Sequence, residues 1–269
     1  MKKNEYLMEN DEEAFRLEIK TERSIVERQA TWAGIETGMR IADIGCGSGK
    51  TTAILNDLVQ PGGMATGVDF SETRIKFARD KYGNRGIEFI CSDITKPLDE
   101  LGMFDFIWVR FVLEYFLSDS FEIVTNLTKI LKPGGILCLI DLDYNCMSHF
   151  GLSEKMEKTL ANIMKALEQK ADFDAYAGRR LYSFLYDLGY VDVKVDIAAH
   201  HLIYGELKEA DAFNWLKKLE VATNRINYQF DEYKGGYNEF LEEFTKFFTD
   251  PRRFTYSPII SCRGRKPQY

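Results

Sequence analysis

The sequence predicts an α/β fold in which a Rossmann-like, mostly parallel sheet carries helices on both faces. Short apolar runs rich in β-branched and aromatic residues alternate with helical segments between residues 40 and 143, which is the pattern of repeated βαβ units. A glycine-rich turn directly follows the first run. Open α/β sheets bind their ligands at such strand ends, so both observations predict a ligand site at the carboxyl edge of the sheet.

Five strands and three helices are expected in this part of the chain. The strand runs are short and apolar, as strands buried on both faces should be. They are RIADI (40–44), MATGVDF (64–70), GIEFICSD (86–93), FDFIWVRF (104–111) and GILCLIDLD (135–143). The helices between them are expected over 49–59, 71–82 and 119–131. Because parallel strands need crossover connections, these helices should cover the faces of the sheet.

The flanking segments extend this core. An acidic segment with apolar residues at helical spacing predicts an N-terminal helix over 10–34. After Asp143 the pattern predicts helices over 151–171, 177–189, 207–222 and 236–249, and strands over 190–203 and 255–265. The long segments 145–175 and 204–252 interrupt the core and are expected to be helical lids, since loops of that length are usually functional. Residues 1–269 would then form a single domain.

Composition narrows the class of partner. The chain has 35 Lys and Arg against 42 Asp and Glu, a net charge of −7. Proteins that bind nucleic-acid phosphates usually have a basic excess, so nucleic acid is not the expected partner. No apolar run reaches the roughly 20 residues of a membrane span, and MKKNEYLMENDEE lacks a signal-peptide core, so a cytoplasmic protein is expected. The five scattered cysteines indicate free thiols and no metal site.

The turn within RIADIGCGSGKTTAIL (40–55) is compared with the loops that bind three kinds of ligand: a nucleoside triphosphate, NAD and a positively charged compound. A triphosphate-binding P-loop needs a glycine where this chain has Ile44. The dinucleotide fingerprint is G-x-G-x-x-G, whereas the spacing here is G-x-G-x-G. Asp43 would also repel a pyrophosphate by about 1 to 4 kcal/mol at contact. A positively charged ligand suits this loop better than an anionic one.

S-adenosylmethionine (SAM) has such a charge, together with ribose hydroxyls and an adenine amino group. Asp69 ends the second strand, 20 residues after Gly49, where a carboxylate can accept both ribose hydroxyls. Asp93 ends the third strand beside Ile94 and could accept from the adenine amino group. Carboxylates at three consecutive strand ends, together with the glycines, form a specific signal for this cofactor.

These motifs also resemble a known family. IADIGCGSG, GVDFSETRIKFAR, SDI, FDFIWVRFVLEYF and LKPGGILCLID are similar to the successive motifs of class I SAM-dependent methyltransferases. The N-terminal segment and AGRRLYSFLYDLGYVDVKV resemble the ubiquinone/menaquinone-methylase-like, small-molecule branch. The resemblance implies seven strands, six parallel and the last antiparallel. It covers about 40–143 best.

The resemblance also implies roles for individual residues. Backbone of the glycine loop would line the methionine part of SAM, with an acid near its ammonium, and the acidic strand ends would hold ribose and adenine. The implied cofactor-binding residues are Tyr6, Arg16, Asp43, Gly45, Cys46, Gly47, Asp69, Phe70, Ser92, Asp93, Ile94 and Arg110. Members often have Leu-Glu-His where this chain has Leu113-Glu114-Tyr115, so a role sometimes given to that histidine is not transferred.

Candidates for the transfer chemistry are isolated rather than clustered. His200 and His201 end the sixth predicted strand and titrate near neutral pH. Because neighbours on a strand face opposite sides, at most one should face a cavity. Tyr144 follows Asp141 and Asp143 at the end of the fifth strand and is a further candidate. His149 lies in the first long segment, and Arg179 and Arg180 could bind an acidic group or be surface charges.

The sequence thus predicts a methyltransferase that moves the SAM methyl group to a small molecule by in-line displacement. Orientation alone can supply on the order of 7–11 kcal/mol of such a barrier, so no dedicated base is required. An RNA or protein methyltransferase and a SAM-binding protein without transfer activity are the alternatives. An NAD oxidoreductase is a more distant one.

Overall fold

The computed structural model describes residues 13–268, which form a sheet of eight strands. The strands are β1 (Arg40–Ile44), β2 (Met64–Asp69), β3 (Glu88–Cys91), β4 (Phe104–Arg110), β5 (Leu131–Leu142), β6 (Ser148–Phe150), β7 (Val191–Tyr204) and β8 (Phe254–Arg265). Their order is β3-β2-β1-β4-β5-β8-β6, and β7 also pairs with β8. β1 to β5 pair in parallel, while β8 is antiparallel to β5, β6 and β7. The predicted fold class is confirmed.

The sheet has one strand more than the seven expected. β6 is only three residues long and pairs with the far end of β8. Its sequence, Ser-His-Phe, has no alternating or apolar run that could have marked it. Its pairing depends on the extra length of β8 beyond the core sheet, a tertiary feature.

Helices cover both faces of the sheet, as predicted. α2 (Arg23–Ala33), α3 (Lys50–Leu58) and α4 (Glu72–Tyr82) pack on one face against Ile41 and Trp108. α5 (Ser120–Lys129) and α7 (Ala177–Asp187) pack on the other against Ala42 and Val109. Neighbouring strand residues therefore contribute to opposite clusters, which explains why the strand sequences are apolar throughout.

The N-terminal segment differs from the single helix expected over 10–34. Its described part contains two helices, α1 (Glu13–Lys20) and α2, with Glu22 in an extended conformation between them. The two helices pack against different parts of the protein. α2 buries Val26 and Ala30 under the sheet, whereas α1 places Leu17 against the glycine turn after β1. The periodicity runs through both helices, so the sequence could not mark the break.

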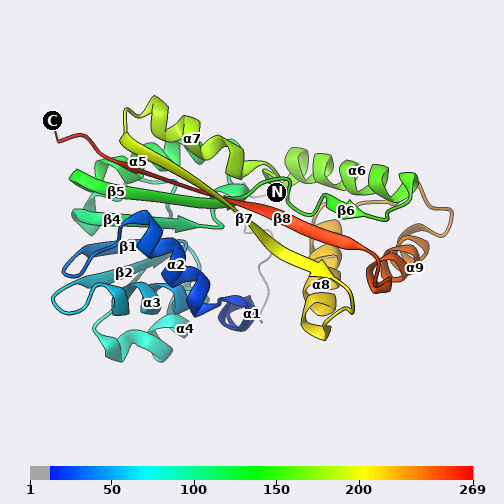
Figure 1. The fold of residues 1–269 in the computed structure, drawn as a ribbon, viewed down its shortest axis with the longest axis horizontal. Coiled ribbons are helices and arrows are strands. Elements are labelled where there is room, and N and C mark those ends of the chain that lie inside the picture. Colours follow the sequence, from blue (N-terminus) through cyan, green and yellow to red (C-terminus); the bar gives the residue numbers. More distant parts are fainter. Residues whose placement is uncertain (1–12, 269) are drawn as a thin grey trace.

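The remaining helices form a separate layer, which we call the helical cap: α6 (Glu154–Ala171), α8 (Glu209–Arg225) and α9 (Gly236–Thr249). They share a third apolar cluster that includes Leu160, Trp215, Phe240 and Phe244. The long antiparallel pair of β7 and β8 runs from the core sheet to these helices (Figure 1). The aromatic residues at helical spacing in α9 are thus the core of the cap. No helix within residues 13–268 has the length and apolarity to cross a membrane.

Candidate functional site

The glycine turn after β1 needs glycine for two physical reasons. Gly45, Gly47 and Gly49 all have left-handed φ, at 74°, 54° and 81°, which costs other residues steric strain. A Cβ on Gly45 would lie 2.3 Å from Cγ2 of Val112, and one on Gly47 would lie 2.8 Å from Cδ1 of Leu17. The turn is therefore packed between the strand edge and α1, with room only for backbone.

Asp69, at the end of β2, holds this turn in place. Its Oδ2 accepts a hydrogen bond from the Gly47 amide at 2.9 Å. Its Oδ1 accepts from the Ser71 amide at 2.9 Å and from the guanidinium of Arg74 at 2.9 and 3.0 Å. Both partners of the ion pair are buried. Arg74 was not predicted, because an arginine in the first turn of a helix has no distinguishing pattern.

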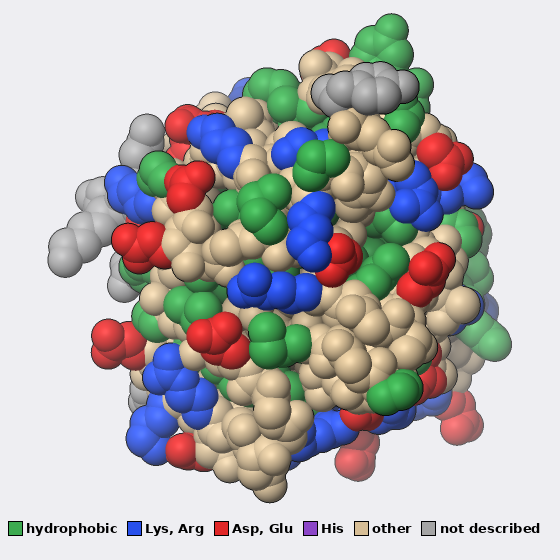
Figure 2. Space-filling model, turned by 90° about the vertical axis from the view of Figure 1, so that its left-hand side faces the viewer, with side chains coloured by type: hydrophobic (Ala, Val, Ile, Leu, Met, Phe, Trp, Pro, Cys, Tyr) green, Lys and Arg blue, Asp and Glu red, His purple; other side chains and the backbone are tan. Residues whose placement is uncertain are grey.

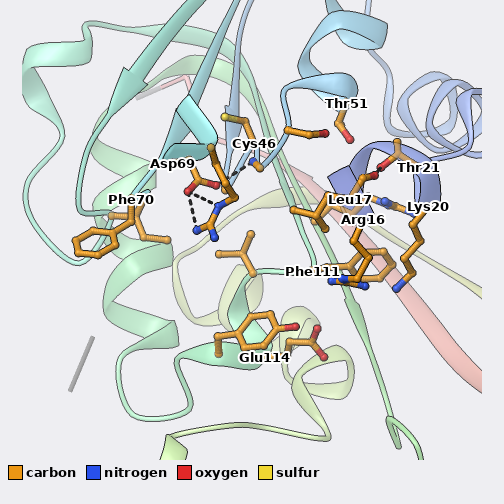
Figure 3. Close-up of a pocket in the computed structure, with 18 of the residues that line it drawn as sticks. Arg16, Leu17, Lys20, Thr21, Cys46, Thr51, Asp69, Phe70, Phe111 and Glu114 are labelled. Carbon is orange, nitrogen blue, oxygen red and sulfur yellow. Dashed lines mark hydrogen bonds and ion pairs between the residues drawn. The ribbon is translucent and has the colours of Figure 1, made fainter. Parts of the chain in front are cut away.

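A cavity of about 190 Å³ lies at the carboxyl edge of the parallel strands. α1, the glycine turn, the ends of β2 to β4, β7 and the cap all contribute to its wall (Figure 3). Most of the predicted site residues line it: Arg16, Gly45, Cys46, Gly47, Asp69, Phe70, Asp93, Ile94, Arg110 and His200. Asp43, Ser92, His201 and Tyr144 are not part of this lining. Tyr6 lies outside the described residues.

Asp43 lies behind the glycine turn rather than at the cavity surface. It is 2% exposed, and its Oδ2 accepts a hydrogen bond from the Thr52 hydroxyl at 2.6 Å. Burial raises the pKa of Asp43 to about 7, with a further rise from Asp69 that the Thr52 bond and Arg110 oppose. A role of Asp43 at the ammonium of SAM stays a prediction.

Of the two neighbouring histidines only His200 lines the cavity, as expected of at most one, but their rings lie side by side rather than on opposite faces of β7. A register shift follows His200 in the pairing with β8, and His201 has φ of 50°. A bulge of this kind breaks the alternation of side chains. The imidazole centroids are 4.0 Å apart. Burial, then the nearby cations, lower the pKa of His200 to about 2 and that of His201 far below its usual value, so both rings are neutral.

The other candidates for chemistry have structural partners. Tyr144 packs on Tyr176, with ring centroids 5.8 Å apart. His149 contacts the Thr255 hydroxyl at 2.9 Å and the Cys146 carbonyl at 3.1 Å. Burial lowers the pKa of His149 to about 4. His149 also packs against Trp215 of α8 and Phe247 of α9, with ring centroids 5.2 and 5.6 Å apart, and so joins the sheet to the cap.

The acidic residues at the end of β5 are also anchors. Asp141 is buried and accepts from the amides of Glu114 and Leu142 at 3.1 and 2.9 Å. It thereby fixes the 3₁₀ turn η3 (Leu113–Tyr115), which follows β4. Asp143 pairs with Arg179 at 2.7 Å, and Arg180 pairs with Asp174 at 2.7 Å. Both arginines therefore already have carboxylate partners, and neither lines the cavity.

Besides Arg74, three charged residues of the cavity were not predicted from the sequence. Lys20 comes from α1, Glu114 from η3 and Lys218 from α8. Glu114 is buried, and its Oε2 accepts a hydrogen bond from the Asn145 side-chain Nδ2 at 2.8 Å. Burial raises the pKa of Glu114, while Lys218 and Lys20 oppose the rise. Neither lysine belongs to a motif, and only the tertiary fold brings the two together.

The described residues contain no cluster of three or more metal-ligating side chains. All five cysteines are free thiols. The chemistry of the cavity therefore depends on glycine-turn backbone, carboxylates, cations and neutral imidazole.

Comparisons with known proteins agree with this geometry. Residues 42–139 match a family model described as a methyltransferase domain. The chain is 24% identical over 190 residues, 64% of this chain and 78% of the relative, to demethylmenaquinone methyltransferase of Staphylococcus aureus strain JH9. Phosphoethanolamine N-methyltransferase 2 of Haemonchus contortus, solved with SAM, is 16% identical, with a TM-score of 0.55 over 91% of this chain and 53% of that one. The [4+2]-cyclase SpnF is 18% identical, with a TM-score of 0.54 over 91% and 81%.

Proposed function

The chain is a class I SAM-dependent methyltransferase, and we propose that it methylates a small molecule held between the glycine turn and the helical cap. The observation that carries the proposal is a single cavity whose wall includes both the glycine turn with Asp69 and residues of the cap. Such a chamber can hold a cofactor at one end and an acceptor at the other.

The residues present fit SAM. Gly45, Cys46 and Gly47 of the turn line the cavity, and the Asp69 carboxylate beside them is a strong hydrogen-bond acceptor. Phe70 is 54% exposed and Ile94 is buried, and both line the cavity near Asp93. The adenine ring of SAM, which is flat and has an amino group, suits two apolar side chains beside a carboxylate. When bound, SAM supplies an electrophilic methyl group on a sulfonium.

The chain's own contribution is to orient the acceptor and to exclude water. α1 bounds the chamber on one side (Figure 3), and Ala171 and Lys218 of the cap also line it. Orientation of this kind can supply about 7–11 kcal/mol. Nε2 of His200 is buried and has no hydrogen-bond partner among residues 13–268. We assign His200 the role of a neutral hydrogen-bonding group for the acceptor. His201 packs against this ring, with centroids 4.0 Å apart and the planes tilted by 46°, and supports it.

Several features argue against a macromolecular acceptor. The net charge is −7, and positive and negative side chains are interspersed on the face of the molecule in Figure 2, at the end far from the cap. Residues of the cap helices line the cavity. An enzyme that methylates a nucleic-acid strand or a peptide would need an open groove instead. Five free thiols favour a reducing compartment, and we propose the cytoplasm.

Calorimetry with SAM and its demethylated product S-adenosylhomocysteine (SAH) tests the cofactor. Both should bind, with NAD and ATP far weaker. Asp69→Asn should lose about 1.5–3 kcal/mol, or roughly ten- to a hundredfold in affinity, the scale of a hydrogen bond to a charged group. Asp57→Asn is the control, since Asp57 pairs with Arg23 and Arg85 away from the cavity. Wild-type protein that binds neither compound would refute the assignment.

A SAM-binding protein without transfer activity is the second candidate. The low pKa of His200 favours it, because a ring that hardly accepts a proton is a poor general base. Transfer of label from methyl-labelled SAM to any acceptor would exclude this candidate. His200→Ala then measures the base contribution, which reaches about 10²–10⁴-fold where a base is used; we expect a smaller loss.

A further inference from the structure

We propose that the methyl acceptor is an anion, a carboxylate or phenolate, held between Lys20 of α1 and Lys218 of α8 with its apolar substituent in a second cavity inside the helical cap. This inference rests on the proposed function. It names the chemical class of the acceptor and the residues that select it.

The two ammonium groups line the main cavity without ion-pair partners. Within residues 13–268, neither Lys20 nor Lys218 has a carboxylate within 4.0 Å. Nζ of Lys20 lies 5.8 Å from the ring centroid of Phe111 (Figure 3), and Nζ of Lys218 lies 3.8 Å from the weak acceptor Sγ of Cys146. By contrast Lys217, one residue earlier, pairs with Glu220 at 3.2 Å on the surface.

The charges around this pair do not balance. Glu114 acts on both lysines, and the buried Asp43 and Asp141 act on Arg110. Burial raises the pKa of all three carboxyl groups, which favours their neutral forms and leaves the cations in excess. Arg16 is already paired with Glu13, and Arg110 donates to the neutral Gln29 side chain at 3.1 Å. Burial and the repulsion from Lys218 and Arg16 lower the pKa of Lys20. SAM carries two positive groups and one negative group, so its binding adds to the excess. An anionic acceptor offsets it.

A second cavity gives the rest of the acceptor its place. It has a volume of about 60 Å³ and shares Tyr115 and Lys218 with the main cavity. The remainder of its wall is mainly apolar and includes Leu160, Trp215 and Phe244. A ligand that places an oxyanion at Lys218 can therefore extend a short apolar chain or ring into the cap. Burial of apolar surface there adds to affinity by roughly 0.8 kcal/mol per CH₂ group.

The anionic form is also the reactive one. A phenol or carboxylic acid loses its proton to water more readily beside ammonium groups, and a lone pair of the resulting oxyanion attacks the methyl carbon. The C–S bond of SAM breaks as the new O–CH₃ bond forms, and SAH leaves as a neutral thioether. The lysines thus replace a dedicated base.

The test is calorimetry on the SAH-loaded, full-length chain with matched ligand pairs: benzoate against benzamide, and hexanoate against hexanamide. The carboxylates should bind about ten- to a hundredfold more tightly than the amides. Lys218→Met should abolish this preference while SAH affinity stays at the wild-type level, and Lys218→Arg should retain it. Lys20→Met should weaken it. Lys217→Met is the matched control on α8 and should change nothing.

The apolar half is tested separately with Ala222→Phe, which fills the second cavity from its wall. Hexanoate should lose affinity in this variant and acetate should not. Equal binding of carboxylate and amide by the wild type, or no binding of either, would overturn the proposal. So would a preference that survives in both methionine variants. A fall in SAH affinity with Lys218→Met as large as that for benzoate would assign the ammonium to the cofactor instead. Failure of SAH to bind the wild type would refute the proposed function itself.

Discussion

The two sides of the cavity are built by different means. On the cofactor side, the backbone of the glycine turn is fixed by left-handed φ angles and by close contacts with Val112 and Leu17. On the acceptor side, the cap packs aromatic and aliphatic residues from three helices around Phe240 and Phe244. A site formed by backbone in left-handed conformations allows few residue types at its positions, so it can be recognised in the sequence as a motif. A site formed by side chains allows many residue types and can vary with the acceptor.

The largest effect is expected from the core of the cap. Phe240 is fully buried, so Phe240→Ala should lower the free energy of unfolding by about 3–5 kcal/mol. Chemical denaturation measures this loss. SAH affinity of the folded fraction should remain close to wild type, because Phe240 is remote from the glycine turn. If SAH affinity fell by as much free energy as the stability does, the cap and the cofactor side would form one cooperative unit, and the contrast between the two sides would not hold.

Next comes the buried carboxylate on the cofactor side. Because the pKa of Asp43 is raised from 3.8 to about 7, the folded state holds a proton that the unfolded state has lost in this pH range. The contribution of Asp43 to stability therefore falls as pH rises from about 4 to 7, by up to roughly 4 kcal/mol. Asp43→Asn should be more stabilising, relative to wild type, at pH 8 than at pH 4.

Asp105→Asn is the control, because the contribution of Asp105 to stability should change with pH in the opposite direction to that of Asp43. Hydrogen bonds from Lys132 and the Arg40 backbone lower the pKa of Asp105 despite its partial burial, so its contribution is present at neutral pH and is lost in acid. Its asparagine variant should be less stable than wild type at pH 8 and similar at low pH. Parallel slopes for the two variants would contradict the assignment of Asp43.

The smallest of these effects comes from a single methyl group in the glycine turn. Gly45→Ala and Gly62→Ala both place alanine at positive φ, 74° and 88°. Only the first puts Cβ in contact, since nothing lies within 4 Å at Gly62. Gly45→Ala should therefore cost about 1–3 kcal/mol more than Gly62→Ala, the usual scale of overpacking, and should weaken SAH binding as well. Equal costs in denaturation would show that the turn is less tightly packed than its geometry indicates.

The sequence allowed more of the cofactor side than of the acceptor side to be predicted. Strand periods and the turn chemistry are local, so β1, its glycine turn and the Asp69 strand end could all be read directly. Lys218 and Lys20 could not, because they are far apart in the chain and each sits on an ordinary amphipathic helix. The bulge at His201 could not either, since alternation is the default until a tertiary contact interrupts it.

The attachment of α1 has a consequence for the rate of turnover. Leu17 lies against the glycine turn. Glu18 links α1 to the body of the protein, since its carbonyl accepts from Lys50 and its carboxylate contacts Tyr82 and Lys81. Arg16, Leu17 and Lys20 of α1 also line the cavity. We therefore expect the detachment of α1 to limit the rate at which SAH dissociates, and this release rather than methyl transfer to limit turnover. Glu18, which lies outside the reacting centre, would then govern the residence time of SAH.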